Sequence, residues 1–316
     1  MLRFVIRRLI LLVPVIAIVG TIVFVLIHLT PGDPAVVVLG QDANPEQIEA
    51  MRERLGLNEP LYVQYFDWFL GAIRLDFGES IFLGQPVTES LLDRAQPTLL
   101  LTFYALTIQV LIAIPFGVIS AVKHNSLLDR ILMVISISGA AIPSFFLGIM
   151  LILFFAVQLQ WLPSGGYTSI TEDPVQHFKQ MILPAFALGF TSAGLLARLV
   201  RSSMLDVLQE DFIRTAKAKG LPQRVLVVRH ALRNALIPAI TVIGYSLGGL
   251  LGGAVVTETV FTIPGMGRLV VQSVARRDFP VIQGAILIIA AIYVLANLLV
   301  DVLYVYIDPR VRYGND

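Results

Sequence analysis

Six long stretches of apolar residues constrain the fold of this 316-residue sequence more than any other feature. Their ranges are Leu9–Leu29, Thr98–Val122, Ile131–Leu159, Met181–Val200, Ala235–Thr259 and Val281–Tyr306. Each has the roughly 20 residues that a helix needs to cross a bilayer, where backbone groups must be hydrogen-bonded within the helix. The sequence therefore predicts an all-α integral membrane protein with six transmembrane helices. Its 56% hydrophobic and only 14% charged residues support this interpretation.

The first apolar run follows three arginines, Arg3, Arg7 and Arg8, an order that signal peptides share. As a helix the run would span about 31 Å, which is longer than the apolar part of a signal peptide and matches the hydrocarbon core of a bilayer. No small-residue cleavage site follows it. We therefore expect residues 1–29 to hold a retained first transmembrane helix.

The distribution of positive charge predicts the orientation of the six helices. With six crossings both termini share one side, and the segments on that side hold 15 of the 23 Lys and Arg residues. Because short loops rich in Lys and Arg stay in the cytoplasm, both termini are predicted to be cytoplasmic. The net charge of only +1 gives no reason to expect nucleic-acid binding.

Residues 30–97 form a long loop, which we place on the external side and expect to contain short amphipathic helices. Asn44 and Pro45 are suited to begin a helix, and Gly56 is suited to end it. The stretch Pro60–Leu70 has aromatic residues at helical spacing, which favours a helix packed on the bundle or lying in the membrane interface. A structural cap and a partner-binding element both fit this loop. Residues 98–316 then hold the other five transmembrane helices.

Prolines predict where several helices begin or bend. Pro97, Pro238 and Pro280 lie near the starts of apolar runs, and the first turn of a helix tolerates proline. Pro115 and Pro143 lie inside apolar runs, where they should kink the helix.

The most polar part of the sequence is the basic segment, "EDFIRTAKAKGLPQRVLVVRH", residues 210–230. The pattern predicts one short helix over Leu205–Lys219, with an ion pair between Glu210 and Arg214. Gly220 can end this helix in the left-handed conformation, and Pro222 can begin a second one. Small residues, Ala216, Ala218 and Gly220, are expected to form a face on it. Two interpretations remain open from the residues alone: a positively charged cytoplasmic loop, or a surface on which a partner docks.

The extended stretch "EDFIRTAKAKGLPQRVLVVRHALRNALIP" resembles the EAA loop of membrane subunits in binding-protein-dependent ABC importers. Arg and Thr replace the Glu and first Ala of the general pattern, as in the dipeptide/oligopeptide branch of that family. Further stretches resemble the first permease subunit of the branch: "HLTPGDPA", "LGLNEPLYVQY", "TETVFTIPGMGRL", "RRDFPVIQG" and "DVLYVYIDPRVRYG". The ordered series covers nearly the whole chain.

This resemblance implies the type I ABC importer permease fold in the inner membrane of a bacterium. It implies a homologous second permease, two cytoplasmic ATPase subunits that bind ATP and Mg²⁺, and an external solute-binding protein. Within the loop at residues 201–234, a short coupling helix would contact an ATPase. The residues that take this role by resemblance are Asp211, Arg214, Thr215, Ala216, Lys217, Ala218, Gly220 and Leu221.

Small and polar residues within the predicted spans are candidates for a solute pathway. Gly244, Gly248 and Gly252 recur every four residues, a spacing that permits close helix packing and also leaves room for a channel. Ser136 and Ser144 could form a second wall. Glu258 and Asp301 are carboxylates near the ends of predicted spans, where hydration alone would explain them.

Several other functions lack the residues that they need. No G-x-x-x-x-G-K-[ST] phosphate loop, no H-E-x-x-H zinc motif and no cysteine occur. We therefore expect no catalytic residue, no metal site and no cofactor in this chain. The alternative is a proton-coupled secondary transporter, which would need carboxylates near the middle of the membrane. The solute is left open among dipeptides, oligopeptides, glutathione and nickel chelates.

Overall fold

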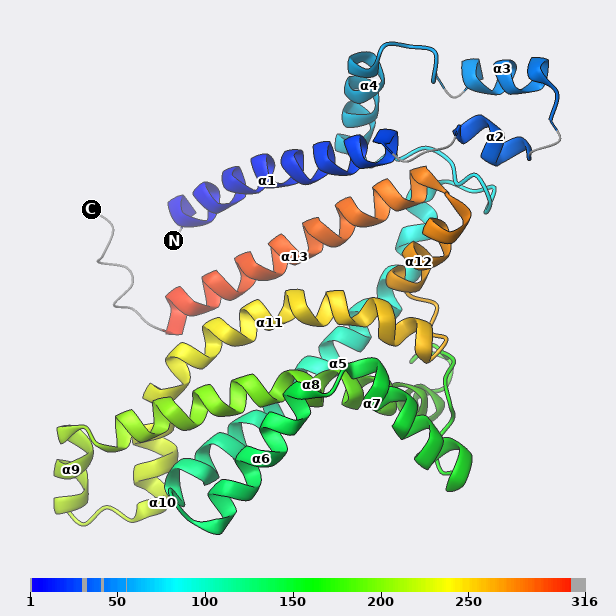
Figure 1. Ribbon diagram of the computed structural model, residues 1–316. Helices are drawn as coiled ribbons and strands as arrows, with labels where there is room; N and C mark the ends of the chain where they lie inside the picture. Colours follow the sequence, from blue (N-terminus) through cyan, green and yellow to red (C-terminus); the bar gives the residue numbers. More distant parts are fainter. Residues whose placement is uncertain (1, 30–32, 41–42, 55, 308–316) are drawn as a thin grey trace. The chain divides into compact units, whose positions relative to one another are not determined.

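The computed structural model describes residues 2–29, 33–40, 43–54 and 56–307, and these residues form helices without a β-sheet (Figure 1). The first four helices are α1 (Leu2–Leu29), α2 (Pro34–Leu39), α3 (Pro45–Arg54) and α4 (Leu61–Ile73). Next come α5 (Val87–Val122), α6 (Leu127–Ala141), α7 (Ser144–Leu151), the π-helical η1 (Ile152–Gln158) and α8 (Pro174–Leu208). The last are α9 (Asp211–Ala218), α10 (Gln223–Val225), the π-helical η2 (Leu226–Ala231), α11 (Leu232–Val260), α12 (Met266–Arg276) and α13 (Phe279–Ile307).

Long apolar helices dominate the described residues. Four are long and apolar enough to cross a membrane: Val87–Val122, Pro174–Leu208, Gln223–Val260 and Phe279–Leu298. A fifth candidate consists of Leu127–Ala141 and Ser144–Gln158, which are joined by a bend of 104°. Val13–Leu26 of α1 is a further, shorter apolar stretch. The all-helical class is confirmed. Five of the six apolar stretches lie within helices, whereas Ile131–Leu159 is interrupted at Ile142 and Pro143.

Proline explains the bend between α6 and α7, which interrupts the third predicted span, Ile131–Leu159. The helix ends at Ala141, and Pro143 has no N–H to continue its hydrogen-bond ladder. The kink predicted at Pro143 is therefore confirmed. The positions predicted for Pro97 and Pro238 are wrong, because α5 begins ten residues before Pro97 and a continuous helix from Gln223 includes Pro238. Hydropathy detects only the apolar part of a helix, and both helices extend beyond it into polar sequence. Pro280 does lie in the first turn of α13.

The chain divides into two compact units. The first comprises Met1–Gln96 and Gly265–Val294, and the second comprises Pro97–Pro264 and Leu295–Asp316. In the first unit, α4 packs on α1 through aromatic rings: the ring of Phe24 lies 5.3 Å from that of Tyr65 and 5.7 Å from that of Trp68. The predicted helix at Pro45 is confirmed, with its Asn44 cap accepting a hydrogen bond from the Gln47 N–H at 2.9 Å. Gly56 follows it in the left-handed region, at φ +68°.

The first unit also contains a polar clamp around the buried side chain of Asp278, between α12 and α13. Its carboxylate accepts a hydrogen bond from the Ser80 hydroxyl at 2.6 Å, and from the backbone N–H groups of Ile81 and Phe82. Phe77, Val87 and Leu91 then pack with residues of α12 and α13 in a shared apolar core. The clamp and this core fix the end of the first loop within its unit.

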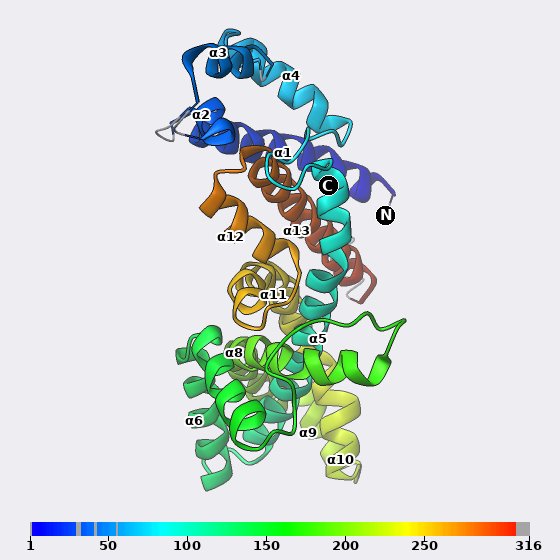
Figure 2. The ribbon, with the colours of Figure 1, turned by 90° about the vertical axis from the view of Figure 1, so that its right-hand side faces the viewer.

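In the second unit, α5, α6 and α11 pack against the long helix α8, and α6 lies alongside α8 in both views (Figure 1 and Figure 2). Glycines permit these close contacts. A Cβ at Gly194 in α8 would lie 2.1 Å from the Ser136 carbonyl oxygen in α6, and a Cβ at Gly117 in α5 would lie 2.8 Å from the Ala197 carbonyl oxygen. Apolar side chains fill the remaining space in two buried clusters, so α8 is the central helix of this unit.

Candidate functional site

The basic segment forms two helical pieces separated by a turn. The single helix predicted over residues 205–219 is wrong: α8 ends at Leu208, Glu210 is extended (φ −65°, ψ 148°), and α9 begins at Asp211. The residue pattern is helical on both sides of this break, so periodicity could not locate it. Gly220 follows α9 in the left-handed conformation, at φ +78°, and ends this first helical piece as predicted. After Pro222 the chain passes through α10 and η2 directly into α11.

Helix α9 has a buried side and an exposed side. Ile213 is 4% exposed and joins Val200 and Met204 of α8 in one apolar cluster, which Ala216 also contacts. Phe212 is 45% exposed, and Thr215 and Ala218 are exposed as well. The protein thus holds α9 by one side and presents the other.

The predicted coupling residues are distributed over both sides of α9. Those that are exposed are Asp211, Arg214, Thr215, Lys217, Ala218 and Gly220, whereas Ala216 and Leu221 are half-buried. The small-residue face predicted for Ala216, Ala218 and Gly220 is therefore wrong, because residues two apart on a helix point in nearly opposite directions. Phe212 lies three residues before Thr215, so both exposed side chains are on one face of α9.

The charges of α9 point away from the protein. Arg214 pairs with Asp211, at 3.4 Å, rather than with the predicted Glu210, and the two side chains are 73% and 95% exposed. Lys217 and Lys219 are exposed beside them. Such exposed pairs contribute little to folding stability, so the charges are available to another molecule.

The pathway candidates do not gather at one place. Ser136 is buried against α8 and its hydroxyl donates to the Leu132 carbonyl oxygen at 2.8 Å, while Ser144 is half-buried in the first turn of α7. On α11, Gly244 is buried, Gly248 is half-buried and Gly252 is exposed. Among the described residues, a Cβ at Gly252 would meet no atom within 4 Å. Exposure thus increases along this glycine row.

Glu258 is fully buried, so the expectation that hydration explains it is wrong. The hydroxyl of Thr98 in α5 donates a hydrogen bond to its carboxylate at 2.5 Å. The backbone carbonyl oxygen of Glu258 accepts from the Ile263 N–H at 2.9 Å. Sequence position suggested a span end, but the folding of residues 261–263 over that end excludes water. The side chain of Asp301 lies outside the described residues.

A polar contact within the second unit was missed. Gln109 of α5 is 1% exposed, and its amide donates to the Ser246 hydroxyl of α11 at 2.9 Å and to the Ser192 carbonyl oxygen of α8 at 3.3 Å. A glutamine inside an apolar run was the available signal. Polar side chains in membrane helices commonly join neighbouring helices, and Gln109 connects three of them.

His177 is the buried histidine of the second unit, and its ring is held by hydrogen bonds. One ring nitrogen contacts the Thr168 carbonyl oxygen at 2.8 Å, and the other contacts the Tyr104 hydroxyl at 3.1 Å. Burial also raises the pKa of the neighbouring Tyr167 phenol. The arrangement is an aromatic packing cluster of His177, Tyr104 and Tyr167.

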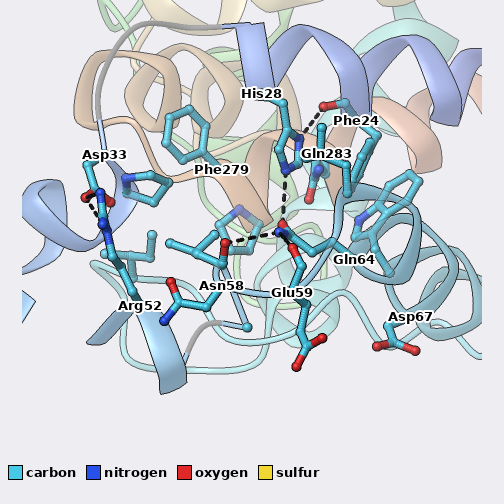
Figure 3. A pocket seen from close by; sticks show the side chains of 17 residues that line it. Phe24, His28, Asp33, Arg52, Asn58, Glu59, Gln64, Asp67, Phe279 and Gln283 are labelled. Carbon is cyan, nitrogen blue, oxygen red and sulfur yellow. Dashed lines mark hydrogen bonds and ion pairs between the residues drawn. The ribbon is translucent and has the colours of Figure 1, made fainter. Parts of the chain in front are cut away.

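A cavity of about 800 Å³ lies in the first unit, between the end of α1, the loop helices and the start of α13 (Figure 3). Its polar side chains bind one another. His28 contacts the side-chain amide oxygen of Gln64 at 3.2 Å, and Arg52 pairs with Asp33 at 2.6 Å. Gln64 in turn donates to the Glu59 carbonyl oxygen at 2.7 Å. The His28–Gln64 contact joins α4 to the end of α1, and the Arg52–Asp33 pair joins α3 to the start of α2.

Comparison with known proteins identifies similar chains over the whole length. The family model described as "Binding-protein-dependent transport system inner membrane component" matches residues 113–313, and the model of its N-terminal region matches residues 1–102. A probable peptide ABC transporter permease protein, y4tP of Sinorhizobium fredii, is 44% identical over 98% of this chain and 99% of its own. The glutathione transport system permease protein GsiC of Escherichia coli K12 is also 44% identical, over 99% of this chain and all of its own.

A solved structure has a similar fold. It is an inward-facing conformation of the MetNI methionine ABC transporter, in which a chain of 20% identity aligns with a TM-score of 0.56. The alignment covers 69% of this chain and 95% of that chain. The likeness supports an importer-type helical fold for the larger part of the chain.

Proposed function

Because the chain belongs to the family of binding-protein-dependent transport system inner membrane components, we propose that it forms one half of the pathway through which an ABC importer moves di- or oligopeptides. The protein is a multi-pass permease subunit of the inner membrane. Such importers also contain a partner permease, an ATPase and a binding protein, and their ATPase activity lies in separate subunits.

The peptide substrate is supported by the peptide and glutathione permeases that the chain resembles at 44% identity. Glutathione is itself a small peptide, so both names indicate the same chemical class. We infer that the solute is released to this chain by the external binding protein. No cofactor or metal is needed in the chain itself, since ATP and Mg²⁺ would bind to the partner ATPases.

The proposed topology has six transmembrane helices with both termini in the cytoplasm, as in type I importers. The positive charges of residues 201–234 then lie in the cytoplasm, and residues 30–97 lie outside. In this arrangement a homologous second permease covers the exposed side of α11 near Gly252. Membrane lipid covers the remaining apolar surface.

The observation that carries the coupling role is the two-sided packing of α9. Ile213 and Ala216 seat the helix on the core of the second unit, while Phe212, Thr215 and Ala218 are presented outward. A short helix fixed in this way can transmit a rigid-body movement of a bound partner to the helices behind it. We propose that one of two cytoplasmic ATPases binds this outer side.

The test is affinity purification of the tagged chain from its native membrane, with Thr215→Arg compared with wild type. Recovery of a second permease and of ATPases with the wild type, and loss of the ATPases alone from the variant, is the expected result. Ala216→Arg is a less direct probe because Ala216 contacts the core, and a longer side chain there would displace α9 itself. Recovery of the wild-type chain without any ATPase would reject the proposed function.

A further inference from the structure

A partly buried ion pair joins α6 to α8 in the second unit. The guanidinium of Arg201 donates two hydrogen bonds to the carboxylate of Asp129, one from Nε and one from a terminal nitrogen, both 2.8 Å long. The side chains are 25% and 5% exposed, respectively. Two parallel bonds between planar groups fix the orientation of the partners as well as their distance.

Asp129 also orders the turn between α5 and α6. Its carboxylate accepts the N–H of Asn125 at 3.0 Å, and its own N–H donates to the Ser126 hydroxyl at 3.2 Å. Asn125 takes the left-handed conformation, at φ 62°, within this turn. Arg201 is therefore connected through one carboxylate to both the turn and the first residues of α6.

On the other side, Arg201 belongs to the same packed body as α9. It lies between Val200 and Met204 in sequence, and these two residues share an apolar cluster with Ile213 of α9. Helix α8 continues from Arg201 to Leu208, and α9 begins three residues later. A displacement of α9 must therefore move the part of α8 that carries Arg201.

Helix α6 leads away from this contact to the 104° bend before α7. Along its length α6 touches α8 mainly through small or apolar groups, including Gly139, where a Cβ would lie 2.8 Å from the Phe190 ring. Apolar contacts in a membrane resist separation of two helices, but they are not directional and allow sliding. The bidentate pair is the directional contact at the end nearest to α9.

We propose that Asp129 and Arg201 are positioning residues that make α6 and its bent continuation move together with α9 during transport. The inference rests on the proposed function, because it assumes that an ATPase moves α9. Without the pair, ATP would still be hydrolysed and α9 would still move, but α6 would follow it incompletely. The pair therefore determines how much solute is carried for each ATP.

The experiment uses the complete importer in proteoliposomes, with dialanine or glutathione, whichever the wild-type complex imports. Transport per ATP hydrolysed is measured for Asp129→Asn/Arg201→Met, which removes both charges at similar volume and leaves no unpaired buried charge. We expect the complex to assemble and hydrolyse ATP, while transport per ATP falls by about tenfold, a common size for coupling between two sites. Arg201→Lys keeps the charge but cannot make both parallel hydrogen bonds, so it should give a smaller fall in transport per ATP.

Matched controls are Arg130→Gln on α6 and Arg198→Gln on α8, both exposed and one turn or less from the pair. They should transport as wild type does. The inference is overturned if the assembled double variant, or Arg201→Lys where the double variant does not assemble, keeps the wild-type ratio of transport to ATP hydrolysis. It is also overturned if ATP hydrolysis and transport fall in proportion, since that indicates a structural role only. A wild-type chain that recruits no ATPase would instead reject the function on which the inference rests.

Discussion

The two most polar regions of the molecule, the loop after α1 and the basic segment, use their polar side chains in opposite ways. In the loop several of these groups bind one another: Arg52 pairs with Asp33 at 2.6 Å, Asn58 donates to Glu49 at 2.8 Å, and Gln64 donates to the Glu59 backbone carbonyl oxygen at 2.7 Å. In the basic segment Arg214, Lys217 and other charged side chains are exposed. Polar composition alone therefore does not distinguish a self-contained cap from a surface that serves a partner. What distinguishes them is whether the polar side chains bond to one another or point outward.

Truncating the aromatic anchor of the loop should have the largest effect. Trp68 packs against Phe24 and against Gly20, where a Cβ would lie 3.2 Å from the indole, so Trp68→Ala should lower the free energy of unfolding by about 3 kcal/mol. Phe66 is on the opposite side of α4 and 59% exposed, so Phe66→Ala should change it by less than about 0.5 kcal/mol. Denaturant unfolding of the purified protein in detergent measures both. Equal losses of unfolding free energy in the two variants would contradict the prediction that the Trp68 side of α4 holds the loop on α1.

A variant of the outer side of α9 should act on association rather than on folding. Thr215→Arg places a long side chain on the presented surface and should weaken ATPase binding by about 100-fold, or about 2.7 kcal/mol. The unfolding midpoint should not change, because Thr215 is exposed. Thr215→Ser, which keeps the hydroxyl, is the matched control and should bind as wild type does. A fall in stability with unchanged binding would show that this side of α9 is structural, as the loop is.

The clamp around Asp278 provides the third comparison. Asp278→Asn weakens hydrogen bonds to the Ser80 hydroxyl and to two backbone N–H groups, and should destabilise the end of the loop by about 2 kcal/mol. Limited proteolysis measures this destabilisation: residues 79–86 should be cleaved faster in the variant than in the wild type. Asp76→Asn is the control in the same loop, since Asp76 is exposed and its carboxylate accepts the Gly78 N–H at 3.0 Å. Similar proteolysis of the two variants would mean that the buried clamp does not hold the loop.

Local signals in the sequence predicted the elements that depend on local chemistry. Asn44 precedes α3 and Gly56 follows it. Gly220 follows α9 and ends that helical piece, and Pro143 interrupts the third predicted span. The approximate positions of the apolar helices followed from hydropathy in the same way. These features depend on residues a few positions apart, so one sequence is sufficient to find them.

Features that depend on distant residues could not be predicted. Nothing near Asp129 in sequence indicates that Arg201, 72 residues later, neutralises it in a buried place. The burial of Glu258 depends on Thr98, 160 residues away, and the inward direction of Ala216 depends on where α8 lies. The resemblance to the EAA loop therefore marked the region of the candidate site, but not which side of α9 is presented.

The smallest expected effect separates the two regions most clearly. Arg214→Gln breaks an exposed pair with Asp211, so the free energy of unfolding should change by less than about 0.5 kcal/mol. If Arg214 faces an ATPase, however, the variant should bind it more weakly at low salt, and the difference should shrink as salt screens the charges. Arg52→Gln is the counterpart in the loop: its pair with Asp33 is more buried, so it should loosen the loop without altering the salt dependence of ATPase binding. Titrations at several salt concentrations measure both variants. A salt-dependent defect for Arg52→Gln, or none for Arg214→Gln, would remove the distinction between an inward-bonded cap and an outward-facing coupling surface.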